Sequence, residues 1–232
     1  ASGYDTHYDG KWHMSHADLI DESTGQILAT NDAAGVVDQE AVDSYHTANP
    51  LDPFGFSGWV GPEPHGGLLA NSGFRRDPLI ADRVVAWLED RYSRRATGDP
   101  SALRPFLLVA SFVNPHDIVL FPAWVQRGMP FEKQVELDPP SIPPSPTDDE
   151  DLATKPAAQV AYRASYPTGY GPAAVVARTY MKNAQKYRDL YYRLHAEVDG
   201  PTDRVRQAVT DGGSEHAVIV RTSDHGELLG SH

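Results

Sequence analysis

The sequence predicts an α/β fold with a mostly parallel central sheet. Three short runs, at residues 4–8, 106–113 and 217–220, have the β-branched, aromatic and apolar composition of strands. Apolar residues at helical spacing lie between them, over 77–95 and again over 178–209. Strands that alternate with helices pair in parallel through right-handed crossovers, so this order of elements favours that fold class.

The first half of the chain contains one long stretch without clear periodicity. Residues 18–76 are rich in Asp, Gly, Asn, Ser and Pro, which predicts a loop-rich insertion above the sheet. A helix is then expected from Asp77 to Arg95, and residues 97–100 (Thr-Gly-Asp-Pro) are expected to end it.

The second half contains a proline-dense stretch. Residues 130–175 are expected to form an extended excursion of the same domain and not a second folded domain. The helix predicted over 178–209 should be kinked or split at Gly200–Pro201, because proline cannot donate its helical hydrogen bond.

Composition limits the classes of function. A chain of 232 residues falls in the one-domain range, and its net charge of −12 argues against a nucleic-acid-binding surface. No apolar run has the length of a membrane helix and no segment resembles a signal peptide, so we expect a soluble protein with no membrane partner. The compartment, cytoplasmic or periplasmic and secreted, stays open. The absence of cysteine excludes disulfides, thiolate metal sites and cysteine nucleophiles within this sequence.

Polar residues of a catalytic or metal-binding type follow each predicted strand. Residues 10–13 (Gly-Lys-Trp-His) follow the first, residues 114–117 (Asn-Pro-His-Asp) the second, and residues 223–227 (Ser-Asp-His-Gly-Glu) the third. Parallel sheets build their sites outside the carboxyl ends of the strands. We therefore predict that the three clusters form one site.

These three motifs resemble, in the same order, those of the sulfatase family of the alkaline-phosphatase-like superfamily. Residues 55–59 (Gly-Phe-Ser-Gly-Trp) and 229–232 (Leu-Gly-Ser-His) are similar to further family stretches. The resemblance spans nearly the whole chain and is weakest across 130–175. It implies an alkaline-phosphatase-like α/β/α sandwich, truncated at both ends, and a small-molecule sulfate ester as the substrate.

The resemblance also implies roles for five residues. Asp224 and His225 match positions that complete a divalent-metal site, with Ca²⁺ expected and Mg²⁺ or Mn²⁺ as alternatives. Lys11 and His13 match groups that contact the nucleophile and the sulfate, and His116 matches a group on a sulfate or leaving-group oxygen. Without the resemblance, the Asp–His pair would be taken as solvated or capping, and Lys11 and His13 as an exposed lysine and a half-buried histidine.

Several neighbouring residues have less certain roles in this interpretation. Asn114 and Asp117 are expected to brace the turn that carries His116. His65 could reach over the pocket, or could be a loop histidine in water. Glu227 could bond its own loop or cap a following helix, and the role of His232 stays undecided.

The family nucleophile is missing from this sequence. Sulfatases carry a Cys or Ser in a C/S-x-P-x-R motif that is oxidised to formylglycine, and neither version occurs here. We therefore expect an inactive fragment of a sulfatase, with the formylglycine and two further Asp ligands upstream. A phosphomonoester, phosphodiester or phosphonate hydrolase of the same superfamily and a non-catalytic sulfated-ligand-binding relative are the alternatives. The oligomeric state does not follow from the sequence.

Overall fold

The computed structural model describes residues 3–65, 67–127, 141–169, 173–212, 217–227 and 229. The chain divides into two compact units. The first comprises Ala1–Asp117 and Ala196–Ile219, and the second comprises Ile118–His195 and Val220–His232.

Two parallel strands form the sheet of the first unit. β1 (Asp5–Gly10) pairs with β2 (Phe106–Ser111) in a register that runs from Asp5 opposite Phe106 to Gly10 opposite Ser111. Both predicted strands are thus confirmed, as is their parallel pairing. Because the strands end at the same level, the segments that follow them leave from one edge of the sheet.

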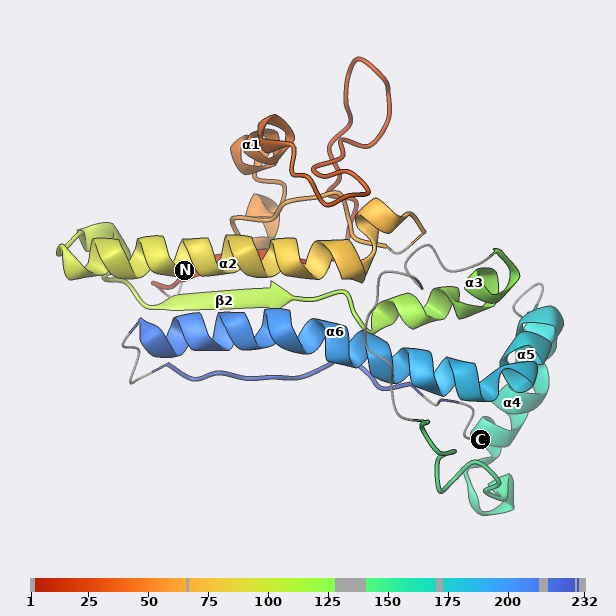
Figure 1. Ribbon diagram of the computed structural model, residues 1–232. Helices are drawn as coiled ribbons and strands as arrows, with labels where there is room; N and C mark the ends of the chain where they lie inside the picture. Colours follow the sequence, from red (N-terminus) through yellow and green to blue (C-terminus); the bar gives the residue numbers. More distant parts are fainter. Residues whose placement is uncertain are drawn as a thin grey trace. The chain divides into compact units, whose positions relative to one another are not determined.

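The long helix α2 (Gly73–Ala96) connects the loop region to β2 and packs on the sheet. Its buried stripe of Ile80, Val84 and Leu88 shares an apolar cluster with β2 and with Val209 of α6 (Ala184–Asp211). In Figure 1, β2 runs between α2 and the C-terminal part of α6. The helix predicted from Asp77 is therefore confirmed, although it begins four residues earlier, after Ser72.

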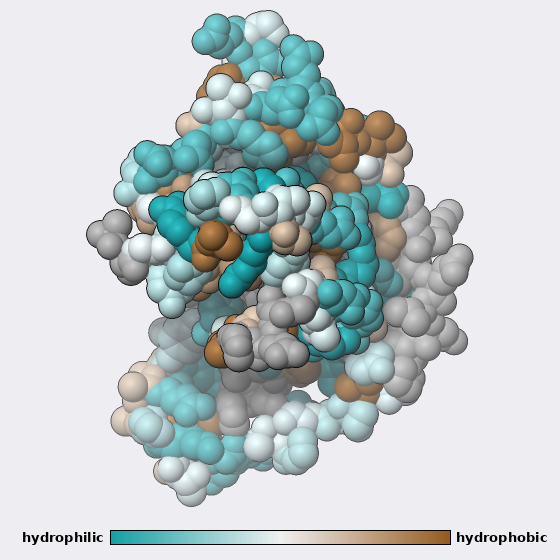
Figure 2. Space-filling model, turned by 90° about the vertical axis from the view of Figure 1, so that its left-hand side faces the viewer, coloured by the Kyte–Doolittle hydropathy of each residue, from teal (hydrophilic) through white to brown (hydrophobic). Residues whose placement is uncertain are grey.

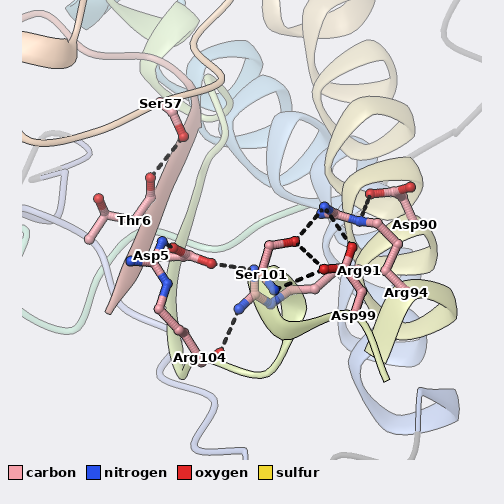
Figure 3. A network of polar contacts seen from close by, with 9 residues as sticks. All are labelled: Asp5, Thr6, Ser57, Asp90, Arg91, Arg94, Asp99, Ser101 and Arg104. Carbon is pink, nitrogen blue, oxygen red and sulfur yellow. Dashed lines mark hydrogen bonds and ion pairs between the residues drawn. The ribbon is translucent and has the colours of Figure 1, made fainter. Parts of the chain in front are cut away.

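Ion pairs fasten α2 to the strands. Asp9 of β1 is fully buried, and Arg83 of α2 donates two hydrogen bonds to it, at 2.6 and 2.9 Å. Asp5, at the start of β1, accepts hydrogen bonds from Arg91 and Arg104 (Figure 3). Paired guanidinium and carboxylate groups of this kind fix geometry as well as charge.

The surface at the C-terminal ends of α2 and α6 is mostly hydrophilic, with scattered apolar residues (Figure 2). No helix in the described ranges combines the length and the apolar character needed to cross a bilayer.

The region before α2 consists largely of loops and also contains a helix that the sequence pattern did not indicate. α1 (Gln39–Ala48) is capped by Asp38, whose side chain accepts from the Ala41 N–H at 3.1 Å. Its buried face consists of Ala41, Val42 and Tyr45. Tyr45 of α1 is fully buried and packs edge-on against Trp59. The remaining short turns of this unit are 3₁₀ helices: Asp52–Phe54, Leu69–Asn71 and Pro100–Ala102.

The second unit is helical in its described residues. It contains α3 (Phe121–Arg127), α4 (Ala157–Gly169), α5 (Ala173–Lys182) and the first part of α6. Phe121, Tyr180 and Tyr187 form an aromatic cluster, with ring centroids 4.6–5.6 Å apart. A 3₁₀ turn, His116–Leu120, leads into this unit, and another, Leu152–Thr154, precedes α4.

The predicted proline-rich excursion is thus partly helical. Residues 157–169 of it form α4, and parts of the stretch, at 130–140 and 170–172, lie outside the described residues.

The C-terminal region differs from the prediction at two points. The helix is interrupted at Asn183, between α5 and α6, and α6 continues through Pro201, so the split expected there is wrong while a kink at Gly200–Pro201 stays a prediction. The Thr202 hydroxyl donates to the Val198 carbonyl at 2.8 Å, a side-chain bond within the same turn. Residues 217–220 form no strand, and Val218 and Val220 are largely exposed. A strand needs a neighbour for its backbone groups, and this run has no paired strand in the described part of the chain.

Candidate active site

The segment after β1 carries the first candidate residues at the carboxyl edge of the sheet. Lys11 continues the pairing, since its N–H donates to the Ser111 carbonyl at 2.8 Å. Gly10 has a positive φ of 108°, and a Cβ at that position would lie 1.9 Å from the same carbonyl oxygen. Only glycine fits there without a shift of backbone.

Trp12 fixes the direction of its neighbours. Its ring is buried against Tyr8 and Phe56, and its indole N–H donates to Ser15 at 2.8 Å. Lys11 and His13 are less buried, and the Lys11 Nζ lies 3.3 Å from the His13 Nδ1. An ammonium beside an imidazole gives two cationic or hydrogen-bonding groups in one place.

The segment after β2 brings His116 to the same edge. The imidazole centroids of His13 and His116 are 6.4 Å apart, although 103 positions separate these residues in the sequence. His65 approaches His116 more closely, with centroids 5.6 Å apart. Burial lowers the pKa of His65 below its usual 6.5, and the charge of His116 lowers it further. The structure thus places Lys11, His13 and His116 near one another and adds His65 to them, while their roles at a sulfate stay a prediction.

The turn that carries His116 is braced by two carboxylates. Asp117 accepts a hydrogen bond from the Gly73 N–H at 2.7 Å, so its predicted bracing role is confirmed. Its Oδ1 also lies 3.8 Å from the His116 Nδ1. The side chain of Asn114, by contrast, is buried and has no hydrogen-bond partner among the residues that the structure describes. The second brace is Asp77, which no sequence motif indicates.

Asp77 lies near the start of α2 and accepts hydrogen bonds from the backbone that leads into the His116 turn. Its two oxygens accept from the Val113 N–H at 2.6 Å and the Asn114 N–H at 3.0 Å. Burial raises the pKa of Asp77 from 3.8 to about 8, against the opposing effect of these two hydrogen bonds. An aspartate within a helical pattern gives no sequence signal of this role, because its donors lie 36 and 37 positions away.

The burial of Asp77 makes the free energy of unfolding depend on pH. An acid whose pKa is higher in the folded than in the unfolded state stabilises the fold below its ordinary pKa, and this contribution is lost as pH rises towards the folded value. We therefore expect the contribution of Asp77 to fall between about pH 4 and pH 8. Asp77→Asn should cost about 1–3 kcal/mol at pH 5, because the amide NH₂ would face one of the two backbone N–H donors, whereas the hydroxyl oxygen of a protonated carboxyl can still accept from it.

Urea unfolding of the wild type and Asp77→Asn at pH 5 and pH 9 tests this prediction. The free energy of unfolding of the wild type should exceed that of Asp77→Asn by more at pH 5 than at pH 9. The exposed Asp43→Asn control should match the wild type at both pH values. A difference that grows with pH would contradict it.

Among the described residues of the first unit, no contact links His7 or His46 to the cluster, whereas His16 lines a hollow together with His13. His7 is buried and stacks on Trp87 with a centroid distance of 4.6 Å, and burial lowers its pKa to about 4. His46 is exposed on α1, as is His16 in the loop after β1.

Asp224 and His225 lie in the second unit, so their predicted convergence with Lys11, His13 and His116 stays a prediction. Their side chains are 87 % and 77 % exposed, and the His225 Nε2 lies 3.6 Å from an Asp224 oxygen. The His225 Nδ1 is 2.8 Å from the Gly226 carbonyl, a contact in which Nδ1 donates. This contact and the Asp224 charge raise the pKa of His225.

No set of three metal-ligating side chains occurs among the described residues. The donor types of Asp224 and His225 fit a divalent cation, and a proton on Nδ1 leaves Nε2 as the ligating nitrogen. Two ligands alone do not complete a calcium site. Glu227 lies beside Tyr187 instead, whose pKa is raised by burial and then by the Glu227 charge. His232 lies outside the described residues.

A second polar hollow lies at the opposite edge of the sheet, and it is a weaker candidate for the active site than the cluster of Lys11, His13 and His116. It has a volume of about 380 Å³ and is lined by the paired Asp5, Arg91 and Arg104. Asp5 pairs with both guanidinium groups, and these ion pairs fasten the start of β1 to α2 and to the segment before β2.

Comparison with known proteins agrees with the motifs. The family model described as "Sulfatase" matches residues 1–232. The chain is 26 % identical over 236 residues to "Uncharacterized sulfatase YidJ" of Escherichia coli (strain K12). This match covers 100 % of the chain and 41 % of the relative, so the chain spans less than half of that protein's length. No solved structure matches.

Proposed function

The chain belongs to the sulfatase family, and we propose that the protein of which it is part hydrolyses sulfate monoesters at the carboxyl edge of β1 and β2. The fold of that family is the alkaline-phosphatase-like α/β fold, in agreement with the parallel strands found here. The observation that carries the proposal is the cluster of Lys11, His13 and His116 after the two paired strands.

This cluster suits a sulfate group chemically. Negative charge spreads over the sulfuryl oxygens and the leaving oxygen as the ester bond breaks. The Lys11 ammonium can stabilise that charge, and His13 donates hydrogen bonds to the same oxygens. His116 can pass a proton to the departing oxygen, and Asp117, 3.8 Å from its Nδ1, would attract the ring when it is protonated.

Asp224 and His225 are proposed to hold a divalent cation, Ca²⁺ by preference, together with ligands from other parts of the protein. Such a cation would polarise the sulfate and the attacking group. The nucleophile belongs to the same proposal: a formylglycine supplied by the full-length gene product. The 232 residues contain no cysteine and no Ser-x-Pro-x-Arg sequence, so we propose that they turn over no ester by themselves.

Asp224→Ala in the full-length gene product is expected to remove the bound cation and abolish hydrolysis. Loss of one carboxylate takes a charged ligand from a site that depends on charge for affinity. Metal content by elemental analysis is the measurement, and Asp149→Ala, another exposed aspartate of the second unit, is the control. Unchanged metal in Asp224→Ala would contradict the assignment.

The substrate class is tested by comparing matched 4-nitrophenyl sulfate and phosphate with the full-length gene product. Preference for the sulfate supports the proposal. Preference for the phosphate monoester, or for phosphodiesters or phosphonates, would identify a different hydrolase of the superfamily, since lysine and histidine serve those oxygens equally well. Binding of a sulfated ligand without turnover would identify a non-catalytic relative.

A further inference from the structure

We propose that Glu63 is the positioning residue that holds His13 in its working orientation. The inference rests on the proposed function, because it takes His13 to be one of the groups that contact the sulfate. Glu63 comes from the loop-rich region, 50 positions away from His13.

The backbone of His13 needs such a partner. Its φ is +50°, in the left-handed region that residues other than glycine rarely adopt. A residue keeps this conformation only where its surroundings hold it there. A partner that holds the backbone directly before His13 can supply this restraint.

Glu63 supplies this restraint from across the loop. Its Oε2 accepts a hydrogen bond from the Trp12 N–H at 3.1 Å. Burial raises the pKa of Glu63 above its usual 4.5, and the N–H groups of His13 and Trp12 oppose that rise, followed by the charges of Lys11 and His13. The carboxylate thus faces two successive N–H groups and two side chains of the candidate site.

The backbone of Glu63 is itself fixed by hydrogen bonds at its N–H and at its carbonyl. Its N–H donates to Asp18 Oδ1 at 2.7 Å, and its carbonyl accepts from the Asn71 side chain, also at 2.7 Å. The three preceding carbonyls, at 60–62, all accept hydrogen bonds from the buried Arg76. The carboxylate is therefore carried by an anchored segment, as a positioning group requires.

Glu63 lies beside the candidate site. Glu63 and His13 line a hollow of about 280 Å³ together with Asp18 and His16. The second carboxylate oxygen, Oε1, is buried and has no hydrogen-bond partner among the described residues. Glu63 acts on chemistry through the backbone of residues 12–13.

The test uses NMR on the 232-residue chain with three variants. Glu63→Ala removes the acceptor, Glu63→Gln keeps a neutral acceptor of the same shape, and Glu22→Ala is the control, an exposed glutamate of the same unit. The readouts are the amide signals of Trp12 and His13, the His13 Cα shift, and titration with inorganic sulfate followed at the His13 and His116 rings.

We expect Glu63→Ala to move the His13 Cα shift from left-handed towards extended values and to weaken sulfate binding about tenfold, as loss of one hydrogen bond to a charged group predicts. Glu63→Gln should restore most of the wild-type His13 Cα shift and most of the sulfate affinity. In the wild type, the Trp12 amide signal should follow the ionisation of Glu63, with a midpoint above 4.5, and it should lose this pH dependence in Glu63→Gln.

The result that overturns the inference is a Glu63→Ala variant with wild-type His13 shifts, or one with altered shifts and unchanged sulfate affinity. If Glu63→Ala does not fold, the missing pH response of the Trp12 amide in Glu63→Gln decides the same point. Failure of the wild type to bind sulfate at the two rings would count against the proposed function, and the His13 backbone shifts would still decide the role of Glu63.

Discussion

Replacing Arg76 by methionine is expected to destabilise the first unit by about 3–5 kcal/mol, the scale found when one partner of a buried charged network is removed. Arg76 is fully buried in the first turn of α2. Its guanidinium donates to the Thr30 hydroxyl at 2.8 Å, the Asn31 amide oxygen at 2.9 Å and the carbonyls of residues 60–62 at 3.0–3.2 Å.

The size of the effect follows from what the substitution leaves behind. Methionine fills a similar volume, so little cavity forms, but five buried oxygens lose a donor at once. Burial lowers the pKa of Arg76 to about 10, which leaves the side chain charged at neutral pH. Arg76→Lys should also be strongly destabilising, because a single ammonium cannot reach acceptors on both sides of a planar fork.

Urea unfolding followed by tryptophan fluorescence measures this loss, since Trp12 and Trp59 lie in the apolar cluster of the same region. Arg75→Met is the matched control. Arg75 is the preceding residue, is partly exposed and donates from Nε to the Ala33 carbonyl at 3.0 Å. We expect its loss to be about 1 kcal/mol or less. Equal losses for the two arginines would contradict the role given to Arg76.

Local sequence pattern was sufficient for the parts of the fold that depend on it. β1, β2 and α2 each show the hydrophobic pattern of a strand or a helix within consecutive residues. All three were predicted near their observed bounds. Parallel pairing then places the segments after β1 and β2 at one edge, which is why Lys11, His13 and His116 can be grouped from the sequence alone.

The predictions that failed concern segments whose structure depends on contacts with other parts of the chain. Residues 217–220 have strand composition, but a strand exists only where another backbone completes its hydrogen bonds. α1 was missed because it is only ten residues long and lies in a stretch whose Asp, Gly, Asn, Ser and Pro content indicates loops. Periodicity indicates which face can be buried, and it does not say what covers that face.

The groups that hold the candidate site were also missed, for a related reason. Arg76 and Asp77 occur together in an Arg-Arg-Asp-Pro stretch that looks solvated in sequence, and Glu63 lies between two prolines in a loop. Each acts on residues tens of positions away, and no local spacing rule reports such contacts. The groups expected to contact the sulfate were predictable from motifs, whereas the buried charges that orient them are recognised only by their contacts in the folded chain.

His116→Ala in the full-length gene product is expected to lower the rate of sulfate ester hydrolysis by about 10²–10⁴-fold, the usual contribution of a general acid. His116 is partly exposed at the edge of the sheet, with Asp117 beside its Nδ1, so its Nε2 is the atom available to a leaving oxygen. The loss should be greatest for esters of weakly acidic alcohols, whose departure depends most on protonation.

Comparing 4-nitrophenyl sulfate with an alkyl sulfate, in the wild type and the variant, measures this dependence. His46→Ala, an exposed histidine on α1, is the control and should leave both rates unchanged. A uniform loss across leaving groups would assign His116 to charge stabilisation of the sulfate alone. Full activity of His116→Ala on both esters would remove it from the site, and the case for the edge of β1 and β2 would then rest on Lys11 and His13.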